Sequence, residues 1–309
     1  MGGNKKELFL HPKLILFPLA QRGFLNFLPD SIFLKLMYQA RFSRKLNLKD
    51  PQSYNEIIQY LKIHDRNPRY PEIVDKYAVR TVIKDTIGEE YLVPLKGVYN
   101  SPEEIKWDEL PQKFILKCTH GTHCSIICSD KNTFDIKHAS TLLNSWLKHN
   151  YYYDAREWPY KTVKPQIMIE ELLTPEQGSE LLDIKIMCFN GKPEFIVLHR
   201  NITNTEDVHT LNLFTTEWES INVEWDGPRY KGTIEQPKQL DKILKLAAEL
   251  SADAPHMRVD FMINEDHIYF GELTLYPGAG FKPFSPDEFD AQIGKLINLE
   301  NAYDKHGRK

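Results

Sequence analysis

The sequence predicts an α+β (mixed α/β) protein, because hairpin signals and helical patterns both recur along the chain. Asn190-Gly191 lies between two apolar, β-branched runs, and a polar turn at 264–266 lies between two further strand patterns. Amphipathic helical patterns separate these strands, and we find no internal repeat or low-complexity segment. The 309 residues give room for one large domain or for about two or three lobes.

The composition is that of an ordinary globular protein, with 41% hydrophobic and 27% charged residues and a net charge of −4. This balance gives no basic footprint for nucleic acid, so no nucleic-acid partner is expected. The apolar run 14–20 is too short to span a bilayer, and no signal-peptide pattern stands out. We expect a cytoplasmic protein with reduced thiols at its four cysteines, which are Cys118, Cys124, Cys128 and Cys188.

Residues 1–50 form a basic, apolar N-terminal arm. Asp30 or Ser31 is expected to cap a helix that carries Ile32 and Met37. One interpretation is that the arm packs on the main body. The other is that it contacts an anionic membrane surface or a lipid-linked glycan, which would place the protein peripherally at the inner face of the membrane.

Residues 51–110 read as a helical segment with some strand. Ser53 and Glu56 form a capping box that opens a helix. A second helix is predicted from Pro71 to about residue 87, which would put Lys76 and Arg80 on one face. The later strand patterns are 91–98, 114–117, 126–128, 166–172, 183–189 and 193–199, and the later helical patterns are 135–149, 238–250 and a last helix capped by Ser285 and reaching about residue 299.

The most informative stretch is the hairpin 258–275. If its strands pair across the polar turn, Asp260 lies near Glu272, and Thr274 shares their face. Such an oxygen-rich set suits Mg²⁺ that carries nucleotide phosphates. Arg258 lies on the same face, where a cation suits phosphoryl transfer. The alternative interpretation is a hairpin with two solvated acids.

Three further groups fit a phosphate-binding chemistry. Lys117 ends a strand and precedes a loop of small and polar residues, although the loop is not a Walker A motif. Glu170, Glu171 and Leu172 end another strand, where backbone groups and a carboxylate suit adenine and ribose. Lys76 and Arg80 form a cationic pair. The alternative interpretation of each group is that its side chains are solvated surface residues. A zinc site at His120, His123, Cys124 and Cys128 is a separate alternative, but the spacing of these residues matches no common zinc-finger pattern.

Taken together, these motifs resemble the TupA-like ATP-grasp family, linked to teichuronopeptide and other cell-surface polysaccharide synthesis. The resemblance covers roughly residues 28–297 and is carried by the stretches LPDSIFLKLMYQARF, LNLKDPQSYNEIIQYLKIHDRNP, VDKYAVRTVI, IGEEYLVPLKGVYNSPEEI, LPQKFILKCTHG, REWPYK, DIKIMCFNGKPEFIVLHR, MRVDFMI and FGELTLYPGAGF.

The resemblance implies the ATP-grasp fold, in which two lobes enclose ATP, together with a helical N-terminal segment. It implies a small lobe at 111–175 and a large lobe with the metal site at 176–309. The implied ATP-binding residues are Lys76, Lys117, Gly121, Thr122, Glu170, Glu171, Leu172, Asp183 and Lys185. The implied magnesium ligands are Asp260, Glu272 and Thr274. Many ATP-grasp enzymes have Asn at the position of Thr274. The implied catalytic residues are Arg258, Arg200 and Lys117. Arg156 and Tyr160 match family positions without an assigned role.

The activity that the resemblance implies is ATP- and Mg²⁺-dependent carboxylate–amine ligation through an acyl phosphate. The expected substrates are an amino acid or other amine and a uronic-acid carboxyl of a capsule or other cell-envelope polysaccharide precursor. The alternatives are a kinase of the same fold that phosphorylates a glycan hydroxyl, and a non-catalytic nucleotide-binding subunit of a polysaccharide assembly machine.

One departure from the family concerns the loop after His120-Gly121. The family has a glycine-rich Ser-Gly-Gly-Asn sequence there, whereas this chain has Thr122-His123-Cys124-Ser125. Fewer glycines restrict positive φ angles and put side chains where backbone should approach phosphate. The loop is therefore expected either to close, with His123 turned outward or adding a donor to phosphate, or to be held open by the bulk of His123 and Cys124.

Overall fold

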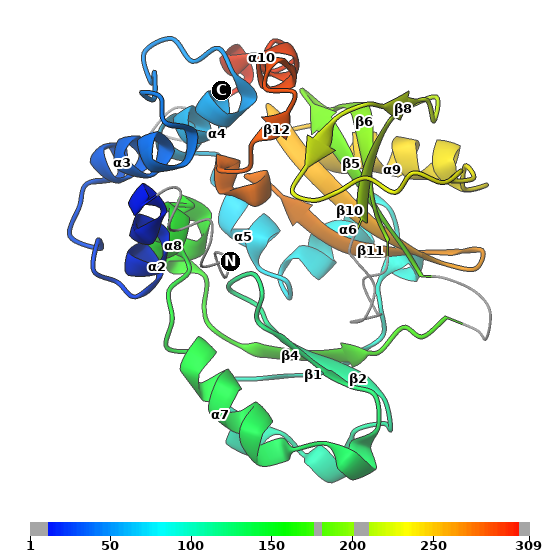
Figure 1. Ribbon diagram of the computed structural model, residues 1–309. Coiled ribbons are helices and arrows are strands. Elements are labelled where there is room, and N and C mark those ends of the chain that lie inside the picture. The colour runs from blue at the N-terminus through cyan, green and yellow to red at the C-terminus, as the bar shows by residue number, and fades with distance from the viewer. Residues whose placement is uncertain (1–11, 176–180, 201–209, 303–309) are drawn as a thin grey trace.

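The computed structural model describes residues 12–175, 181–200 and 210–302, so the first part of the predicted arm lies outside it. Two antiparallel sheets dominate the fold (Figure 1). The small sheet has the order β1-β4-β2-β3, with strands β1 Leu95–Tyr99, β2 Phe114–Cys118, β3 Ser125–Cys128 and β4 Ile167–Glu171. The large sheet has the order β11-β10-β5-β6-β7-β8, with strands β5 Leu182–Phe189, β6 Lys192–Arg200, β7 Thr210–Thr215, β8 Ser220–Ile221, β10 His256–Asn264 and β11 His267–Thr274. A short pair joins β9 Glu224–Trp225 to β12 Phe284–Ser285.

The helices surround these sheets. They are α2 Leu16–Gln21, α3 Asp30–Phe42, α4 Tyr54–His64, α5 Tyr70–Val74, α6 Val79–Thr86, α7 Ile136–Trp146, α8 Tyr152–Ala155, α9 Leu240–Ser251 and α10 Glu288–Gly294, with 3₁₀ turns that include Trp158–Thr162 and Pro277–Gly280. In Figure 1, α7 lies below the small sheet, and α2, α3, α4 and α8 lie together on the far left. The mixed helix and sheet class predicted from the sequence is confirmed.

The small sheet has its own apolar core. Phe114 and Leu116 of β2 and Ile167 of β4 are fully or almost fully buried, and Leu143 of α7 packs against them. Alternate residues of β2 point into this core, as the period of two of a strand requires. Strand β1 belongs to the same sheet although it precedes the predicted start of the small lobe at residue 111.

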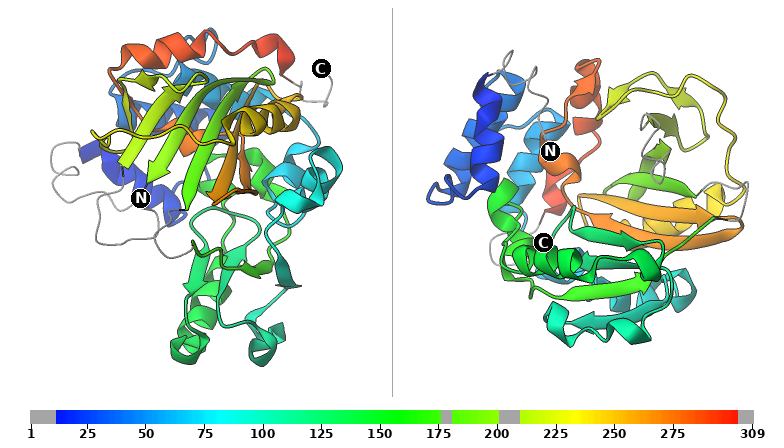
Figure 2. Two further views of the ribbon diagram at one scale, coloured as in Figure 1. Left: turned by 90° about the vertical axis from the view of Figure 1, so that its right-hand side faces the viewer. Right: turned by 60° about the horizontal axis from the view of Figure 1, so that its bottom comes forward.

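The large sheet is built on the hairpin β5–β6. Its turn is Asn190-Gly191, with φ angles of 51° and 78°, the left-handed geometry that this dipeptide favours. Helix α9 packs on the sheet through Ile243 and Ala247, which are fully buried (Figure 2, left). The sheet is therefore the main core of the molecule.

The described part of the arm packs on the body. Phe33, Leu34 and Met37 of α3 are fully buried and cluster with Ala155 and Phe281. Helix α3 therefore packs against the body, and contact of the arm with a membrane stays a prediction. Across the described ranges, the helices are too short or too polar to traverse a bilayer.

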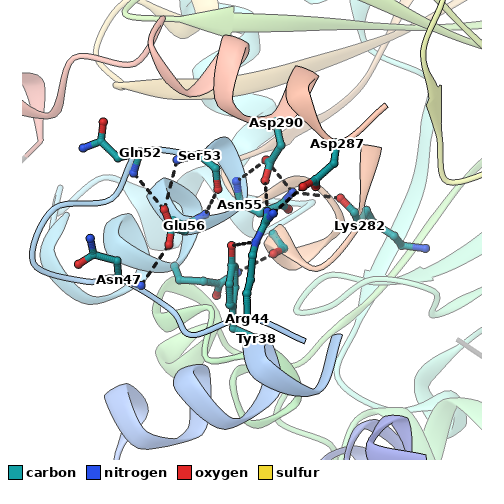
Figure 3. A network of polar contacts seen from close by, with 12 residues as sticks. Tyr38, Arg44, Asn47, Gln52, Ser53, Asn55, Glu56, Lys282, Asp287 and Asp290 are labelled. Carbon is teal, nitrogen blue, oxygen red and sulfur yellow. Dashed lines mark hydrogen bonds and ion pairs between the residues drawn. The ribbon is translucent and has the colours of Figure 1, made fainter. Parts of the chain in front are cut away.

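A polar network joins the N-terminal helices to α10 (Figure 3). Arg44 donates to Asp287 at 2.6 Å and to the buried Asp290 at 2.9 Å. Asn55 donates its backbone and side-chain N–H groups to the other Asp290 oxygen at 2.9 and 2.8 Å. The predicted capping box of Ser53 and Glu56 is present at the start of α4. Asp290 therefore ties α4 and the segment after α3 to the last helix.

Three predicted helices differ from those in the structure. The helix predicted from Pro71 breaks after α5, because the Asp75 carboxylate accepts from the N–H groups of Tyr77 and Ala78 and starts α6 anew. Lys76 therefore lies in the break, off any helix face shared with Arg80. Helix α3 has no side-chain cap at Asp30 or Ser31, and α10 begins after Asp287 without the predicted Ser285 cap and ends at Gly294.

Candidate functional site

The acidic hairpin is formed as predicted. Asp260 and Glu272 are direct cross-strand partners in β10 and β11, and Arg258 stands opposite Thr274. Gly271 fits closely beside them, because a Cβ there would lie 3.1 Å from the Asp260 carbonyl oxygen, a tight contact. Residues two apart on a strand share a face, so all four side chains lie on one face of the sheet.

Arg258 holds the two carboxylates together. Its Nε and Nη2 donate to the two oxygens of Asp260, each at 2.7 Å, and Nη2 also lies 2.6 Å from Oε1 of Glu272. Thr274 donates its hydroxyl to the same Glu272 oxygen at 2.9 Å. Burial disfavours the guanidinium charge, but the two acids outweigh burial and raise the pKa of Arg258. The charged form of Arg258 is thereby fixed in place.

Lys185 of β5 adds a second cation. It stands opposite Asp260 in the strand register, and its Nζ lies 2.8 Å from Oδ2 of Asp260 and 2.8 Å from Oδ2 of Asp183. Burial opposes the charge of Lys185, yet Asp260 and Asp183 together raise its pKa. Asp183, the residue expected near the ribose, thus carries a lysine partner in this structure.

Lys76 reaches the site from the break between α5 and α6. Its backbone N–H donates to Thr119 O at 3.0 Å, and its ammonium group donates to Gly121 O. Burial lowers the pKa of Lys76; the field of Glu272 opposes this shift, and the field of Lys117 adds to it. Among the described residues no carboxylate lies within 4 Å of the Lys76 ammonium group. A cation in this position favours an anionic ligand.

A carboxylate joins Lys117 to the hinge, the strand end Glu170–Leu172 that is expected to contact adenine. Nζ of Lys117 lies 2.7 Å from Oε2 of Glu170, and Nη1 of Arg80 lies 2.7 Å from Oε1. Glu170 is only 4% exposed, so both of its oxygens are used by these cations. The Glu170 side chain therefore positions Lys117, and a ligand at the hinge would meet mainly the backbone. Glu171 points outward and pairs with Lys96 at 2.8 Å.

The loop between β2 and β3 carries the altered family motif. His123 has a φ of 57°, in the left-handed region that favours glycine. Cys124 donates its thiol to Thr122 O, and its carbonyl accepts from Cys118 N at 2.9 Å. His120 turns toward α7, where its Nε2 lies 3.0 Å from Trp146 O. The four cysteines are free thiols, as predicted.

Two buried charged residues were missed by the sequence analysis. Lys62 is 1% exposed and Glu157 is 5% exposed. Burial is the main cause of both pKa shifts, downward for Lys62 and upward for Glu157, and the field of each residue partly offsets the shift of the other. The available signal was the position of Lys62, four residues after Ile58 on the apolar side of its helix.

The arrangement of donors fits magnesium and a nucleotide. Mg²⁺ is held in proteins by one or two carboxylates together with substrate phosphates. Asp260 and Glu272 supply two carboxylates, and Thr274 supplies a hydroxyl oxygen beside them. Lys76 lies within electrostatic range of both Glu272 and Lys117, so a phosphate near Lys76 would also be close to a magnesium ion held by the acids.

The Arg200 side chain lies outside the described residues, so its place relative to the site stays a prediction. Within the described ranges, no three His, Cys, Asp or Glu side chains converge as metal ligands. A cavity of about 50 Å³ lies elsewhere, between α5, α6 and α9, and Leu273 lines it. Leu273 points to the opposite side of β11 from Glu272 and Thr274, so this cavity is separate from the acidic face.

An antiparallel small sheet, a larger sheet with two facing carboxylates, and lysines between them are the arrangement of an ATP-grasp protein. The model of one family, TupA-like ATPgrasp, matches residues 56–298. The chain belongs to this TupA-like ATP-grasp family. A comparison with curated protein sequences gives no match.

Solved ATP-grasp ligases resemble the chain at a distance. D-alanine–D-alanine ligase from Bacillus anthracis, complexed with ATP, is 14% identical over 66% of this chain and 54% of that one, with a TM-score of 0.38. Phosphoribosylamine–glycine ligase from Thermotoga maritima is 15% identical over 70% and 52%, with a TM-score of 0.43. D-alanine–D-alanine ligase from Helicobacter pylori is 15% identical over 81% and 65%, with a TM-score of 0.41. The chain thus spans between about half and two thirds of the length of these ligases.

Proposed function

We propose that this protein is an ATP-dependent carboxylate–amine ligase that works through an acyl phosphate. The single observation that carries the proposal is the face of β10 and β11 on which Arg258 and Lys185 bind the facing acids. A solvated pair of acids would need no such cations, and burying them would be costly. A face of this kind is suited to hold charge that moves between phosphate oxygens.

The proposed residue roles follow from position. Lys76 and Lys117 bind the phosphates of ATP, and the N–H groups of Gly121 and Thr122 close over them. The backbone at Glu170–Leu172 contacts adenine, and Asp183 with Lys185 lies toward the ribose. Asp260, Glu272 and Thr274 hold Mg²⁺, which when bound would draw electron density from the phosphate oxygens. Arg258, together with Arg200, binds the acyl phosphate.

The reaction divides into two displacements. A carboxylate oxygen of the first substrate attacks the γ-phosphorus, and the bond from that phosphorus to the ADP oxygen breaks. The amine nitrogen then attacks the acyl carbon, inorganic phosphate leaves, and the nitrogen gives up a proton. The protein's part is to hold both partners in line and to neutralise the phosphoryl oxygens, because no side-chain nucleophile is needed.

The proposed substrates are an amino acid and the uronic-acid carboxyl of a cell-surface polysaccharide precursor. This rests on the family to which the chain belongs. The precursor would be met at the cytoplasmic face of the membrane, where ATP is available. Exposed Phe24 and Phe27 beside Arg22 offer a surface that could contact lipid there.

The test is ADP release from Mg·ATP in the presence of pooled uronic acids, with and without the pooled amino acids. Release that needs both pools, and an amide product by mass spectrometry, is the expected result. Release with the sugars alone, together with a phosphorylated hydroxyl, would favour the kinase. ATP binding without any release would favour a non-catalytic nucleotide-binding subunit.

A further inference from the structure

Glu157 is a buried carboxylate that no group in the described chain satisfies. It is 5% exposed, and its carboxylate oxygens make no hydrogen bond or ion pair with any described residue. Burying a carboxylate in this way is expensive unless some partner binds it. Glu157 has no part in the proposed binding of magnesium and acyl phosphate by the acidic hairpin.

The nearby lysine does not supply that partner. Nζ of Lys62 donates to Gln59 Oε1 at 3.1 Å, to Ala155 O at 2.9 Å and to Ala279 O at 2.7 Å. An ammonium group has three protons, so these contacts use all of them. Lys62 therefore offsets the charge of Glu157 through space and leaves the carboxylate lone pairs free.

The residues on either side hold Glu157 rigidly. Arg156 has a left-handed φ of 59°, is 1% exposed, lies 4.3 Å over the ring of Phe33 and donates to Leu25 O at 2.9 Å. Trp158 packs against Tyr70, with ring centroids 6.0 Å apart. Arg156 is the C-cap of α8, a position where the left-handed conformation is common.

The Glu157 carboxylate lies within electrostatic range of Glu272 and Arg258 on the acidic face. Glu157 and Glu272 both act electrostatically on the Tyr160 hydroxyl, and Glu157 is within range of Arg258 as well. The Tyr160 ring lies 4.9 Å from that of Tyr151, centroid to centroid, in an edge-to-face pair. Tyr151 in turn lies against Gly121 of the β2–β3 loop, since a Cβ on that glycine would stand 3.5 Å from the tyrosine Cβ.

The ligand that fits these surroundings is a monovalent organic cation. An unpaired carboxylate within electrostatic range of two tyrosines attracts an ammonium group by charge and hydrogen bonding, and the ring faces add to this attraction. A metal ion fits less well, because Glu157 supplies one carboxylate, whereas the acidic hairpin offers two facing carboxylates and a hydroxyl.

We propose that Glu157, with Tyr151 and Tyr160, binds the ammonium group of the amine substrate beside the acyl-phosphate site. The proposal rests on the proposed ligase function and adds to it the residue that selects a cationic amine. Glu157 is a recognition residue in this account. The competing explanation is that Glu157 serves only as a counter-charge for Lys62 and stabilises the fold.

The first experiment measures binding of the pooled twenty amino acids to the full chain by saturation-transfer NMR, with Mg·ADP present. Wild type, Glu157→Gln, Glu157→Asp and the control Asp154→Asn are compared. Asp154 lies three residues away and pairs with His149 at 2.9 Å, so its variant removes one negative charge from the same segment. Thermal melting and Mg·ADP affinity report whether each variant is folded.

We expect at least one amino acid to bind wild type and Asp154→Asn, and its N-acetyl form to bind neither. Glu157→Gln should weaken that binding by roughly tenfold or more, with Mg·ADP affinity unchanged, because a charged hydrogen bond is lost. Glu157→Asp should recover part of it. Absence of any amino-acid signal in wild type, or equal binding by Glu157→Gln, would overturn the proposal.

A second measurement separates this proposal from the ligase itself. Hydroxylamine, a small neutral nucleophile, traps an acyl phosphate as a hydroxamate without needing an ammonium site. Hydroxamate formation from pooled uronic acids and ATP that is equal in wild type and Glu157→Gln, with amide formation impaired only in the variant, supports both proposals. A wild type that forms no hydroxamate and releases no ADP defeats the ligase function. Normal amide formation by Glu157→Gln with an unchanged KM for the amine defeats only the role of Glu157.

Discussion

Asp260 and Glu272 face each other across β10 and β11, and one guanidinium donates to both of their carboxylates. Their environments differ, since the side chain of Asp260 is 4% exposed and that of Glu272 is 35% exposed. Asp260 is bound by two cations, Arg258 and Lys185, whereas Glu272 keeps one oxygen free of them. Glu272 is thus the more accessible of the two acids to an incoming metal ion.

The first prediction concerns these two acids. Glu272→Gln keeps the shape of the side chain and removes its charge, so Mg²⁺-dependent ATP turnover should fall on the order of 100-fold or more. Asp260→Asn should lose as much activity and also lower the melting temperature, because Arg258 and Lys185 are left facing a neutral amide. Turnover and melting curves of both variants check this. Mg²⁺-dependent turnover close to wild type in both would remove the metal assignment.

The second prediction separates the two lysines. Lys76→Met and Lys117→Met should each weaken ATP more than adenosine, because adenosine has no phosphates to lose. Titration calorimetry with both ligands measures the difference. Arg80→Met is the control, since Arg80 binds Glu170 and not the phosphates in the proposed arrangement. A Lys117→Met variant that weakens ATP and adenosine equally would show that Lys117 only supports the hinge.

The third prediction is a pH dependence at Lys76. Burial lowers the pKa of Lys76, so the ammonium group loses its proton at a lower pH than an exposed lysine does. ATP affinity should be highest below that pKa and should fall as the pH rises through it. Lys76→Arg keeps its charge at these pH values and should bind ATP with a flatter profile. An identical decline in wild type and Lys76→Arg would assign the effect to another group.

Short-range patterns predicted the hairpins well. The alternation around Asp260 and Glu272 fixes which residues share a face, and Asn190-Gly191 fixes its own turn. The break at Asp75 was missed, because a helical pattern continues through it and only the side-chain cap reveals the interruption. TupA-like ATP-grasp membership agrees with the resemblance found from the motifs.

The buried residues of the site could not be predicted in the same way. Lys62 is satisfied by carbonyls 93 and 217 residues further along the chain. Glu157 reads in the sequence as an ordinary polar residue before a tryptophan. Its burial depends on elements that are remote in sequence, and no local period encodes their meeting.

The fourth prediction tests how the N-terminal helices are fastened to the body. Asp290→Ala leaves two buried N–H donors of Asn55 without an acceptor, which should lower the free energy of unfolding by about 1–3 kcal/mol. Asp287→Ala removes the other partner of Arg44, but the Asp287 side chain is 61% exposed, so its cost should stay within about 1 kcal/mol. Urea denaturation of both variants measures this. Equal losses of unfolding free energy in the two variants would mean that the buried Asp290 stabilises the fold no more than the exposed Asp287 does.

A related expectation concerns the exposed aromatics before α3. Phe24 and Phe27 are 64% and 80% exposed, and Arg22 and Lys35 are exposed nearby. If this surface contacts anionic lipid, flotation with anionic vesicles should show binding that weakens as salt rises, and a Phe24→Ser, Phe27→Ser variant should lose it. Ile127→Ser, which alters an exposed apolar residue on the small sheet, serves as the control. Wild type that fails to float even at low salt would leave these helices with the packing role alone.

The last prediction concerns the loop of His123, where the chain departs from its family. The left-handed φ of His123 costs a non-glycine residue about 1–2 kcal/mol, so His123→Gly should raise the melting temperature. Gly121 is already anchored by the Lys76 ammonium group, which supports a loop that closes over phosphate without further glycines. The His123→Gly, Cys124→Gly variant should therefore gain stability but little ATP affinity or turnover. A large gain in both ATP affinity and turnover from the two glycines would instead show that the natural loop is impaired, and the non-catalytic nucleotide-binding role would then account for the chain better than the ligase.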